Sequence, residues 1–327
     1  MPSPVPDQPG LLLRDPFRYT DTVLIIPPVW VIALPLFDGE HTDLEALEAI
    51  YKRTGHMAPK DSINHLIDTL KDEGFLETEE FEARREKCHR QFAEAAERLP
   101  AHSGSAYPDD ADAVRQTLKG YFDQSAICNP QSAIIGLAAP HVSPSGGWNS
   151  YAAAYRCLTP ELADRTFVLL GTSHYGAPER FGLTAKPYVT PLGKTEVDRV
   201  LHDRLAAAVA DSVILEDYCH SIEHSIEFQV LFLEYVMGRP VKVLPILCGA
   251  FAESLQGGGA PESNEQVQRF LGALGEMAAR EGDRLFWLLG IDMAHMGRRY
   301  GDDFEALADQ GAMQEVAGRD QIGRAHV

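Results

Sequence analysis

Three short apolar runs in the chain each end on a histidine. They cover residues 134–141 (IIGLAAPH), 167–174 (FVLLGTSH) and 285–295 (LFWLLGIDMAH). Runs this short and this apolar, bounded by Gly or Pro, are typical of strands that are buried on both faces of a sheet. In open α/β sheets, ligands bind at the carboxyl ends of such strands. The pattern therefore predicts a metal or catalytic site where these strands end.

From residue 100 onward, stretches with helical periodicity alternate with strand-like runs. This alternation favours an α/β fold, specifically a layered α/β sandwich with a mixed or mostly parallel sheet. Because His141 and His174 are separated by about the length of one strand–helix–strand crossover, we expect them on adjacent parallel strands. The expected strands are 134–139, 166–171, 241–247 and 285–291, and the expected helices are 112–122, 197–209, 223–237 and 264–281.

Residues 1–99 are predicted to form a separate small domain, and residues 100–327 the main one. Two short strands are expected first, at 11–13 and 23–26, followed by two amphipathic helices over 42–55 and 61–72. Thr42 and Glu45 have the spacing of a capping box, and Gly55 ends the first helix. An extended wing at 74–81 (GFLETEEF) would complete a winged-helix-like α+β module, and a connecting helix would span 81–99.

Modules of this kind often bind DNA, but the charge pattern opposes that use here. The second helix and its end, DSINHLIDTLKDEG, contain one Lys, and the whole chain has a net charge of -19. Binding to phosphate backbones depends on clustered Lys and Arg. We therefore expect no nucleic-acid partner, and we favour either partner docking or structural support as the role of the module.

Composition also limits the location of the protein and the chemistry of its cysteines. The N-terminus, MPSPVPDQPG, has no basic segment followed by an apolar core, and no apolar run reaches the length of a membrane helix. A cytoplasmic protein without membrane contact is expected. The five cysteines are odd in number and lack a CxxC pair, which indicates neither a disulfide framework nor a zinc knuckle.

The first two histidines at strand ends are candidate metal ligands. After His141, the sequence SPSGG predicts a turn, and a helix is expected over 151–158. His174 has an equivalent position in GTSHYG. Paired neutral imidazoles suit Fe, Zn or Cu. The alternative is that each histidine is a hydrogen-bonded structural residue.

The segment CHSIEHSIEFQ, residues 219–229, adds further titratable groups. If it starts a helix, His220 and His224 share one face, as do Glu223 and Glu227, because each pair is spaced i,i+4. The string HSIEH also matches the H-x-x-E-H pattern of one class of zinc proteases. The alternative is a solvated, charged first helical turn.

Asp292 and His295 follow the third apolar run. Asp292 could orient an imidazole as a hydrogen-bond acceptor, and His295 could ligate a metal or act as a general acid or base. Arg298 and Arg299 are expected to pair with Asp302 and Asp303. A capped loop without function is the alternative for this cluster.

Five motifs in order resemble those of the Memo family, whose bacterial members are called AmmeMemoRadiSam system protein B. The resemblance begins near residue 100, and some family members have an extra N-terminal domain. It implies a fold like that of class III extradiol dioxygenases, which hold non-haem Fe(II) with two histidines and a carboxylate. The motifs are HSGSAYP (102–108), APHVSPSGG (139–147), GTSH (171–174), EHSIE (223–227) and D-x-x-H (292–295).

The resemblance also implies a role for each candidate residue. His141 and His174 match the paired metal-binding histidines, His224 matches a third pocket histidine, and Asp292 with His295 matches the last motif. Animal members have a metal-binding cysteine where this chain has Ala294, so a His-His-Cys copper site is not expected. Family members continue further past the last motif, and the ending IGRAHV resembles a translated sequencing adapter. We therefore expect a truncated C-terminus with 322–327 non-native.

These observations give one leading functional hypothesis and two alternatives. The leading one is a metal-binding, dioxygenase-like redox enzyme of unknown substrate that uses Fe(II) or Cu, with Zn as a further option. The metal ligands would be His141, His174 and His224, and the catalytic residues would be His224, Asp292 and His295. The first alternative is a non-catalytic protein that binds a peptide or a partner, such as the radical-SAM protein that the family name implies. The second is a zinc hydrolase that uses the HSIEH segment.

Overall fold

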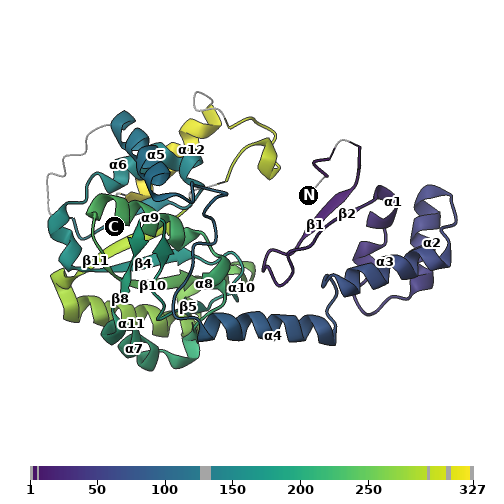
Figure 1. Cartoon of the computed structure of the whole chain (residues 1–327), viewed down its shortest axis with the longest axis horizontal. Helices are drawn as coiled ribbons and strands as arrows, with labels where there is room; N and C mark the ends of the chain where they lie inside the picture. Colours follow the sequence, from purple (N-terminus) through teal and green to yellow (C-terminus); the bar gives the residue numbers. More distant parts are fainter. Residues whose placement is uncertain (1–2, 6, 126–133, 293–294, 307–310, 325–327) are drawn as a thin grey trace.

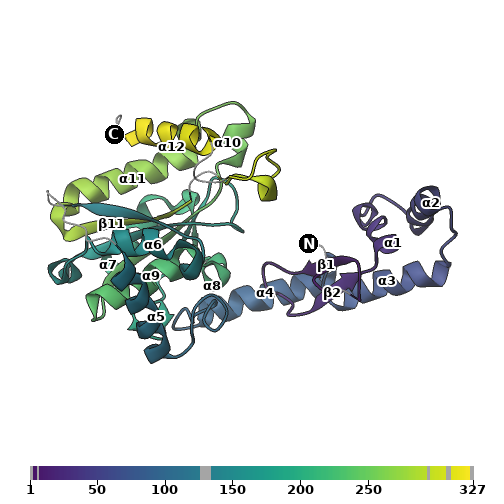
Figure 2. The same ribbon diagram turned by 90° about the horizontal axis from the view of Figure 1, so that it is seen from above.

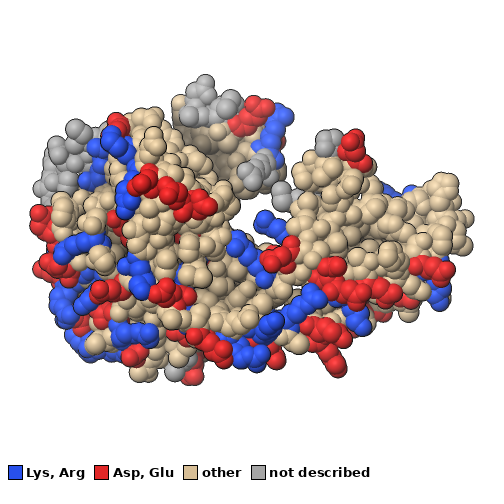
Figure 3. All heavy atoms as spheres, viewed as in Figure 1, with Lys and Arg blue, Asp and Glu red and all other residues tan. Residues whose placement is uncertain are grey.

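The structure is a computed structural model, and it describes residues 3–5, 7–125, 134–292, 295–306 and 311–324. A central sheet lies between two layers of helices, and an N-terminal module, from β1 to α4, extends to one side (Figures 1 and 2). Acidic and basic side chains are intermixed over the face that Figure 3 shows. No helix among the described residues is both long and apolar enough to cross a lipid bilayer.

The central sheet has seven strands in the order β3-β11-β4-β10-β5-β9, and β8 also pairs with β10. All of its pairs are parallel except β5 with β10, which confirms an α/β fold with a mixed, mostly parallel sheet. The four strands expected from the sequence are all present. The strands are β3 (Gly136–Pro140), β4 (Thr166–Thr172), β5 (Phe181–Leu183), β8 (Glu196–Val197), β9 (Val213–Leu215), β10 (Lys242–Cys248) and β11 (Leu285–Ile291).

Alternate residues of the central strands pack on opposite layers of helices. Phe167 and Leu169 of β4 face one core, and Val168 between them faces the other. Burial on both faces explains why these strands are continuously apolar in sequence. The first core packs against α5 (Ala111–Gln124), α6 (Pro144–Tyr155) and α9 (Ser225–Met237), and the second against α7 (Arg199–Ala208) and α11 (Glu265–Glu281).

Smaller elements connect these layers. A two-stranded antiparallel sheet, β6 (Val189–Thr190) with β7 (Gly193–Lys194), packs near the end of α9. The remaining α-helices of this domain are α8 (Cys219–Ile222), α10 (Ala252–Gln256) and α12 (Gly311–Arg324). The 3-10 turns are Leu34–Leu36, Pro160–Asp164, Ala210–Ser212, Pro261–Ser263, Gly282–Arg284 and Arg298–Tyr300.

The prediction that His141 and His174 follow adjacent strands is wrong. Strand β11 lies between β3 and β4, with Gly290 aligned with both Ala139 and Gly171. The connection from β3 to β4 is long enough to pass over one intervening strand, so its length did not require the two strands to be neighbours. The consequence is that Asp292, which follows β11, lies next to His141, with its Oδ2 3.2 Å from Nε2 of that ring.

The segment after His141 also differs from its prediction. SPSGG is not a turn before a helix at residue 151, because it forms the first turn of α6, which begins at Pro144. The Ser143 hydroxyl accepts a hydrogen bond from the Gly146 N–H at 3.3 Å, and Pro144 occupies the first helical position, where its missing N–H has no cost.

The N-terminal module has the expected strands and helices but not the expected wing. Thr42 and Glu45 form the predicted capping box, and Gly55 ends the helix with φ of 73°. Within residues 74–81, Thr78 caps a helix that begins at Glu79, and no strand forms there. The two-stranded sheet instead precedes the helices. The elements are β1 (Leu11–Arg14), β2 (Val23–Ile26), α1 (Pro28–Val31), α2 (Asp43–Thr54), α3 (Lys60–Asp72) and α4 (Glu79–Glu94), so α4 ends before residue 99.

Aromatic residues join this module to the main domain. The ring of Tyr218 stacks on His89 of α4 at 4.6 Å and on Tyr19 at 5.4 Å between centroids. Its hydroxyl donates a hydrogen bond to the Phe17 carbonyl at 2.9 Å. Phe17 in turn lies 5.6 Å from the ring of Tyr175, the residue after His174. The module therefore packs beside the candidate site.

One buried carboxyl group in the main domain has an incomplete set of hydrogen bonds. Glu234 of α9 is 7% exposed, and its Oε2 accepts a hydrogen bond from the Thr190 hydroxyl. Its Oε1 has no hydrogen-bond partner among the described residues. Burial raises the pKa of Glu234 to about 7, although the bond from Thr190 acts in the opposite direction.

The raised pKa gives a prediction for stability against pH. Between pH 4.5 and about 7 the folded chain binds a proton at Glu234 that the unfolded chain has lost, so this group destabilises the fold as pH rises through that range. We expect Glu234→Gln to raise the free energy of unfolding by about 2 kcal/mol above pH 7 and by little near pH 4.5. Urea unfolding at both pH values measures this, with the exposed Glu48→Gln as control. An equal effect at both pH values would contradict it.

Candidate metal centre

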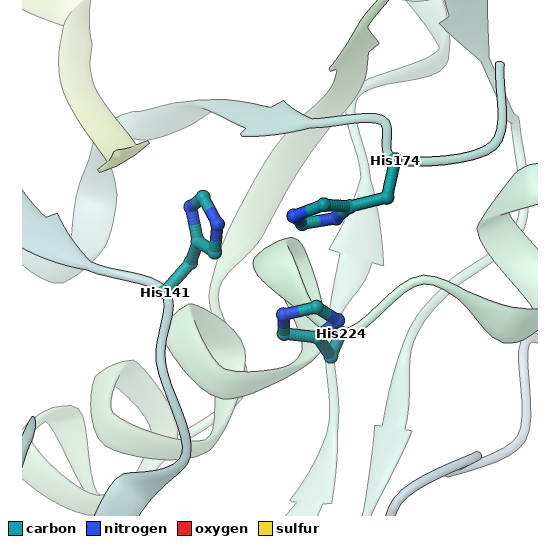
Figure 4. Close-up of side chains that lie close together, drawn as sticks. All are labelled: His141, His174 and His224. Atoms are coloured by element: carbon teal, nitrogen blue, oxygen red, sulfur yellow. The ribbon is translucent and has the colours of Figure 1, made fainter. Parts of the chain in front are cut away.

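Three histidines meet at the carboxyl edge of the sheet. His141 directly follows β3, His174 lies two residues after β4, and His224 caps the start of α9. Each offers a ring nitrogen, and these nitrogens lie within 4.8 Å of one another. Figure 4 shows the rings of His174 and His224 stacked, with His141 turned across them. This cluster could hold a metal ion.

A break in the helix places His224 in the cluster. The helix expected over 223–237 is present as α9, but the alternative of one helix that starts at Cys219 does not hold, because α8 ends at Ile222, Glu223 has an extended ψ of 139°, and α9 begins at Ser225. His220 and His224 therefore do not share a face. His220 is fully buried elsewhere, with Nδ1 2.7 Å from the Tyr188 hydroxyl and Nε2 3.0 Å from the Gly182 carbonyl oxygen. The two-histidine helix face that a zinc hydrolase would need at HSIEH is not formed.

Two glycines let the first turn of α9 approach the strand ends. A Cβ on Gly171 would lie 2.5 Å from Ile226 Cγ1, and one on Gly290 would lie 2.9 Å from the Ser225 carbonyl oxygen. Side chains at these positions would push the helix away from the sheet. A hydrogen bond then holds the start of α9 against the end of β4, since Ser225 Oγ donates to the Thr172 carbonyl at 2.7 Å. His224 is thus brought level with the ends of β4 and β11.

Glu223 orients two of the three histidines. Its carboxylate accepts hydrogen bonds from the backbone N–H groups of His174 and His224, both at 2.8 Å. It also lies 3.0 Å from Nδ1 of His174 and 2.9 Å from Nδ1 of His224. Burial opposes the charged form, but the hydrogen bonds from His174 and His224 outweigh it and hold the pKa of Glu223 well below its usual range. With Nδ1 of both rings engaged, Nε2 of each remains available for a metal.

His141 presents a buried nitrogen without a hydrogen bond. Its Nδ1 lies 3.3 Å from the Gly290 carbonyl oxygen. Its Nε2 is 3.2 Å from Asp292 Oδ2 but is not aligned for a hydrogen bond, and it has no hydrogen-bond partner among the described residues. Burial lowers the pKa of His141, which favours the neutral ring. A buried neutral imidazole with a free lone pair is a suitable ligand for Fe, Zn or Cu.

Asp292 and His295 form a pair at the edge of the cluster. Asp292 Oδ2 lies 2.6 Å from Nε2 of His295, whose side chain is half exposed. The same oxygen is the one near His141, so Asp292 contacts an imidazole on each side. Ala294 lies outside the described residues.

Of the charges after His295, Arg298 pairs differently from the prediction, and the side chain of Arg299 lies outside the described residues. Arg298 lies 3.7 Å from Glu305. Asp302 accepts a hydrogen bond from the Gly297 N–H at 2.7 Å.

A buried ion pair beneath the cluster was not predicted from the sequence. Arg98 and Glu227 are in contact and fully buried. Arg98 also donates to the carbonyl oxygens of His220, in α8, at 2.8 Å and of Glu223, at the helix break, at 2.7 Å. Glu227 accepts from the Tyr107 hydroxyl and from the N–H groups of Ala101 and His102, both at 3.0 Å. The sequence feature that could have indicated this buried pair is the HSGSAYP motif, because its His102 and Tyr107 both donate to Glu227.

Comparisons with a family model and with individual relatives point to the same family. Residues 98–324 match the family model described as Memo-like protein. A MEMO1 family protein of Aquifex aeolicus is 28% identical over 295 residues, which is 89% of this chain and 73% of the relative. Those of Thermococcus kodakarensis and Pyrococcus furiosus are 31% and 30% identical over 221 and 216 residues, covering 65% and 64% of this chain and 70% and 68% of the relatives.

Proposed function

Because the chain belongs to the family of Memo-like proteins, we propose that His141, His174 and His224 hold a divalent metal ion for redox chemistry on a small molecule or peptide. The observation that supports this most directly is the convergence of three imidazoles. Glu223 holds two of them, and the third has a buried Nε2 that makes no hydrogen bond to any described residue. A nitrogen-rich site with a nearby carboxylate suits Fe(II) or Cu, with Zn as the other option. The resemblance to extradiol dioxygenases favours Fe(II).

The other residues of the site have separate roles in this proposal. Bound Fe(II) or Cu would supply electron transfer with an oxidant such as dioxygen. Glu223 keeps the rings of His174 and His224 in the orientation that leaves Nε2 free. The Asp292–His295 pair stands at the solvent side, where His295 can take up or release a proton while Asp292 stabilises the charged ring. His224 would act as the third ligand or as a further acid–base group.

Metal analysis tests the proposal. The metal-free protein is titrated under anaerobic conditions with Fe(II), Cu and Zn in turn, and the bound metal is counted after gel filtration. We expect one ion per chain for the wild type and loss of this stoichiometry in the double variant His141→Ala, His174→Ala. The matched control is His56→Ala, His65→Ala in the N-terminal module. Equal, substoichiometric metal in the wild type and the cluster variant would refute the proposal.

A second candidate function is partner binding without catalysis. It is favoured by the exposed apolar side chains of Leu44, Tyr51 and Met57 on and after α2, which are 67%, 50% and 78% exposed. Such side chains on a module outside the main core suit docking of another protein, and the radical-SAM protein implied by the family name is the candidate. The cluster double variant separates the two functions, since docking would survive it.

A further inference from the structure

A second cavity lies at the other end of α9 from the histidine cluster. It has a volume of about 290 Å³ and lies between the end of α9, the β6–β7 hairpin and α5. Glu234 lies ten positions after His224, which corresponds to about 15 Å along the helix. This cavity is therefore distinct from the candidate metal centre. Its polar lining includes Arg115, Lys194, Glu234, Tyr235 and Arg239.

At the base of the cavity, one carboxylate oxygen of Glu234 has a hydrogen-bond donor and the other has none among the described residues. The Thr190 hydroxyl accepts a hydrogen bond from the Leu192 N–H at 3.0 Å and donates its own proton to Glu234 Oε2. Oε1 of Glu234 faces Gly193, where an added Cβ would lie 3.7 Å away. Since Glu234 is 93% buried and Oε1 has no partner among the described residues, a hydrogen-bond donor from outside the chain would complete the site.

Three cations line the same cavity. Arg115 pairs with Asp112 at 3.3 Å, Lys194 with Glu97 at 2.6 Å, and Arg239 with Asp164 at 2.8 Å. These pairs are largely solvent-exposed, and exposed ion pairs contribute only about 0–1 kcal/mol. The cations can therefore exchange these partners for an anionic group on a ligand.

We propose that this cavity binds a small zwitterion whose ammonium group donates to Oε1 of Glu234 while its carboxylate contacts the cations Arg115, Lys194 and Arg239. The last turn of α9 adds to the attraction for the ammonium group, because the carbonyl end of a helix has partial negative charge. The cavity is at the lower limit of the roughly 300–1,000 Å³ typical of small-molecule sites, which suits an amino-acid-sized ligand. The site goes beyond the proposed metal function and does not depend on it.

The test uses 6-aminohexanoate and 4-aminobutanoate as probes, with hexanoate and hexylamine as probes that each lack one charge. Isothermal titration calorimetry on the whole protein measures binding. We expect saturable binding of at least one zwitterion and weaker binding of both single-charge probes. Glu234→Gln should weaken zwitterion binding about tenfold or more, because a hydrogen bond to a charged group is lost.

A second variant keeps the carboxylate and fills the space beside it. Gly193→Ala places a methyl group at ordinary contact distance from Oε1, so the fold is retained while the ammonium position is blocked. It should weaken binding as Glu234→Gln does, whereas the exposed Glu48→Gln should not. The proposal is overturned if neither zwitterion binds, which would mean that water alone satisfies Oε1, or if both cavity variants bind like the wild type.

Discussion

Replacing Arg98 by methionine is expected to lower the free energy of unfolding by about 3–5 kcal/mol, because the change leaves the Glu227 carboxylate buried without its countercharge. Arg98 and Glu227 are both fully buried, and the remaining donors to Glu227 are neutral. The carbonyl groups of His220 and Glu223 would also lose their donor. Chemical denaturation of the metal-free protein measures the effect.

A control at an exposed arginine separates the effect of losing a buried charge from the effect of losing any positive charge. Arg269→Met removes an arginine whose pair with Asp211, at 3.1 Å, is exposed, and it should cost less than about 1 kcal/mol. A double-mutant cycle with Glu227→Gln should show strong coupling to Arg98→Met. If Arg98→Met and Arg269→Met lower the free energy of unfolding equally, the buried pair of Arg98 and Glu227 does not stabilise the fold as described.

The second large effect is expected at Glu223. Glu223→Gln should lower metal affinity about 10- to 100-fold, because one amide oxygen cannot accept from both His174 and His224. The amide nitrogen would also face an Nδ1 that then has no acceptor. Competition with a chelator of known affinity measures the change.

The control for this variant is a buried glutamate elsewhere. Glu179 is 3% exposed and accepts from the Ser254 N–H and the Asn264 amide, so Glu179→Gln makes the same chemical change away from the histidines. It should leave metal affinity unchanged. Unchanged affinity in Glu223→Gln as well would show that Glu223 does not orient the metal ligands.

The strands and the histidine cluster were accessible from the sequence. A continuously apolar run such as FVLLG has few alternatives to a buried strand, and parallel strands place their carboxyl ends at one edge. His141 and His174 could therefore be assigned to one edge. The order of the strands could not, because connection length limits but does not determine whether another strand, here β11, enters between two neighbours.

The helix break at Glu223 could not be predicted from its own sequence. Local periodicity favours a continuous helix across His220 and His224, and breaking it exposes backbone carbonyl groups that need donors. Arg98 supplies those donors from more than a hundred residues away. By contrast, the start of α6 could have been recognised, since Ser143 followed by Pro144 is a common N-cap and first-position pair.

The place of β11 in the sheet also determines when the site can form during folding. Strand β3 pairs with β11 and with no other strand among the described residues, so β3 has no sheet neighbour until residues 285–291 have been synthesised. Contacts this distant in sequence form slowly because a long loop must close first. His141 therefore reaches its position late, after β4 and β10 can pair. A nascent chain that lacks β11 already contains all three histidines, but β3 then has no strand to hold His141 beside the other two. We therefore expect metal capture to follow the last strand of the sheet.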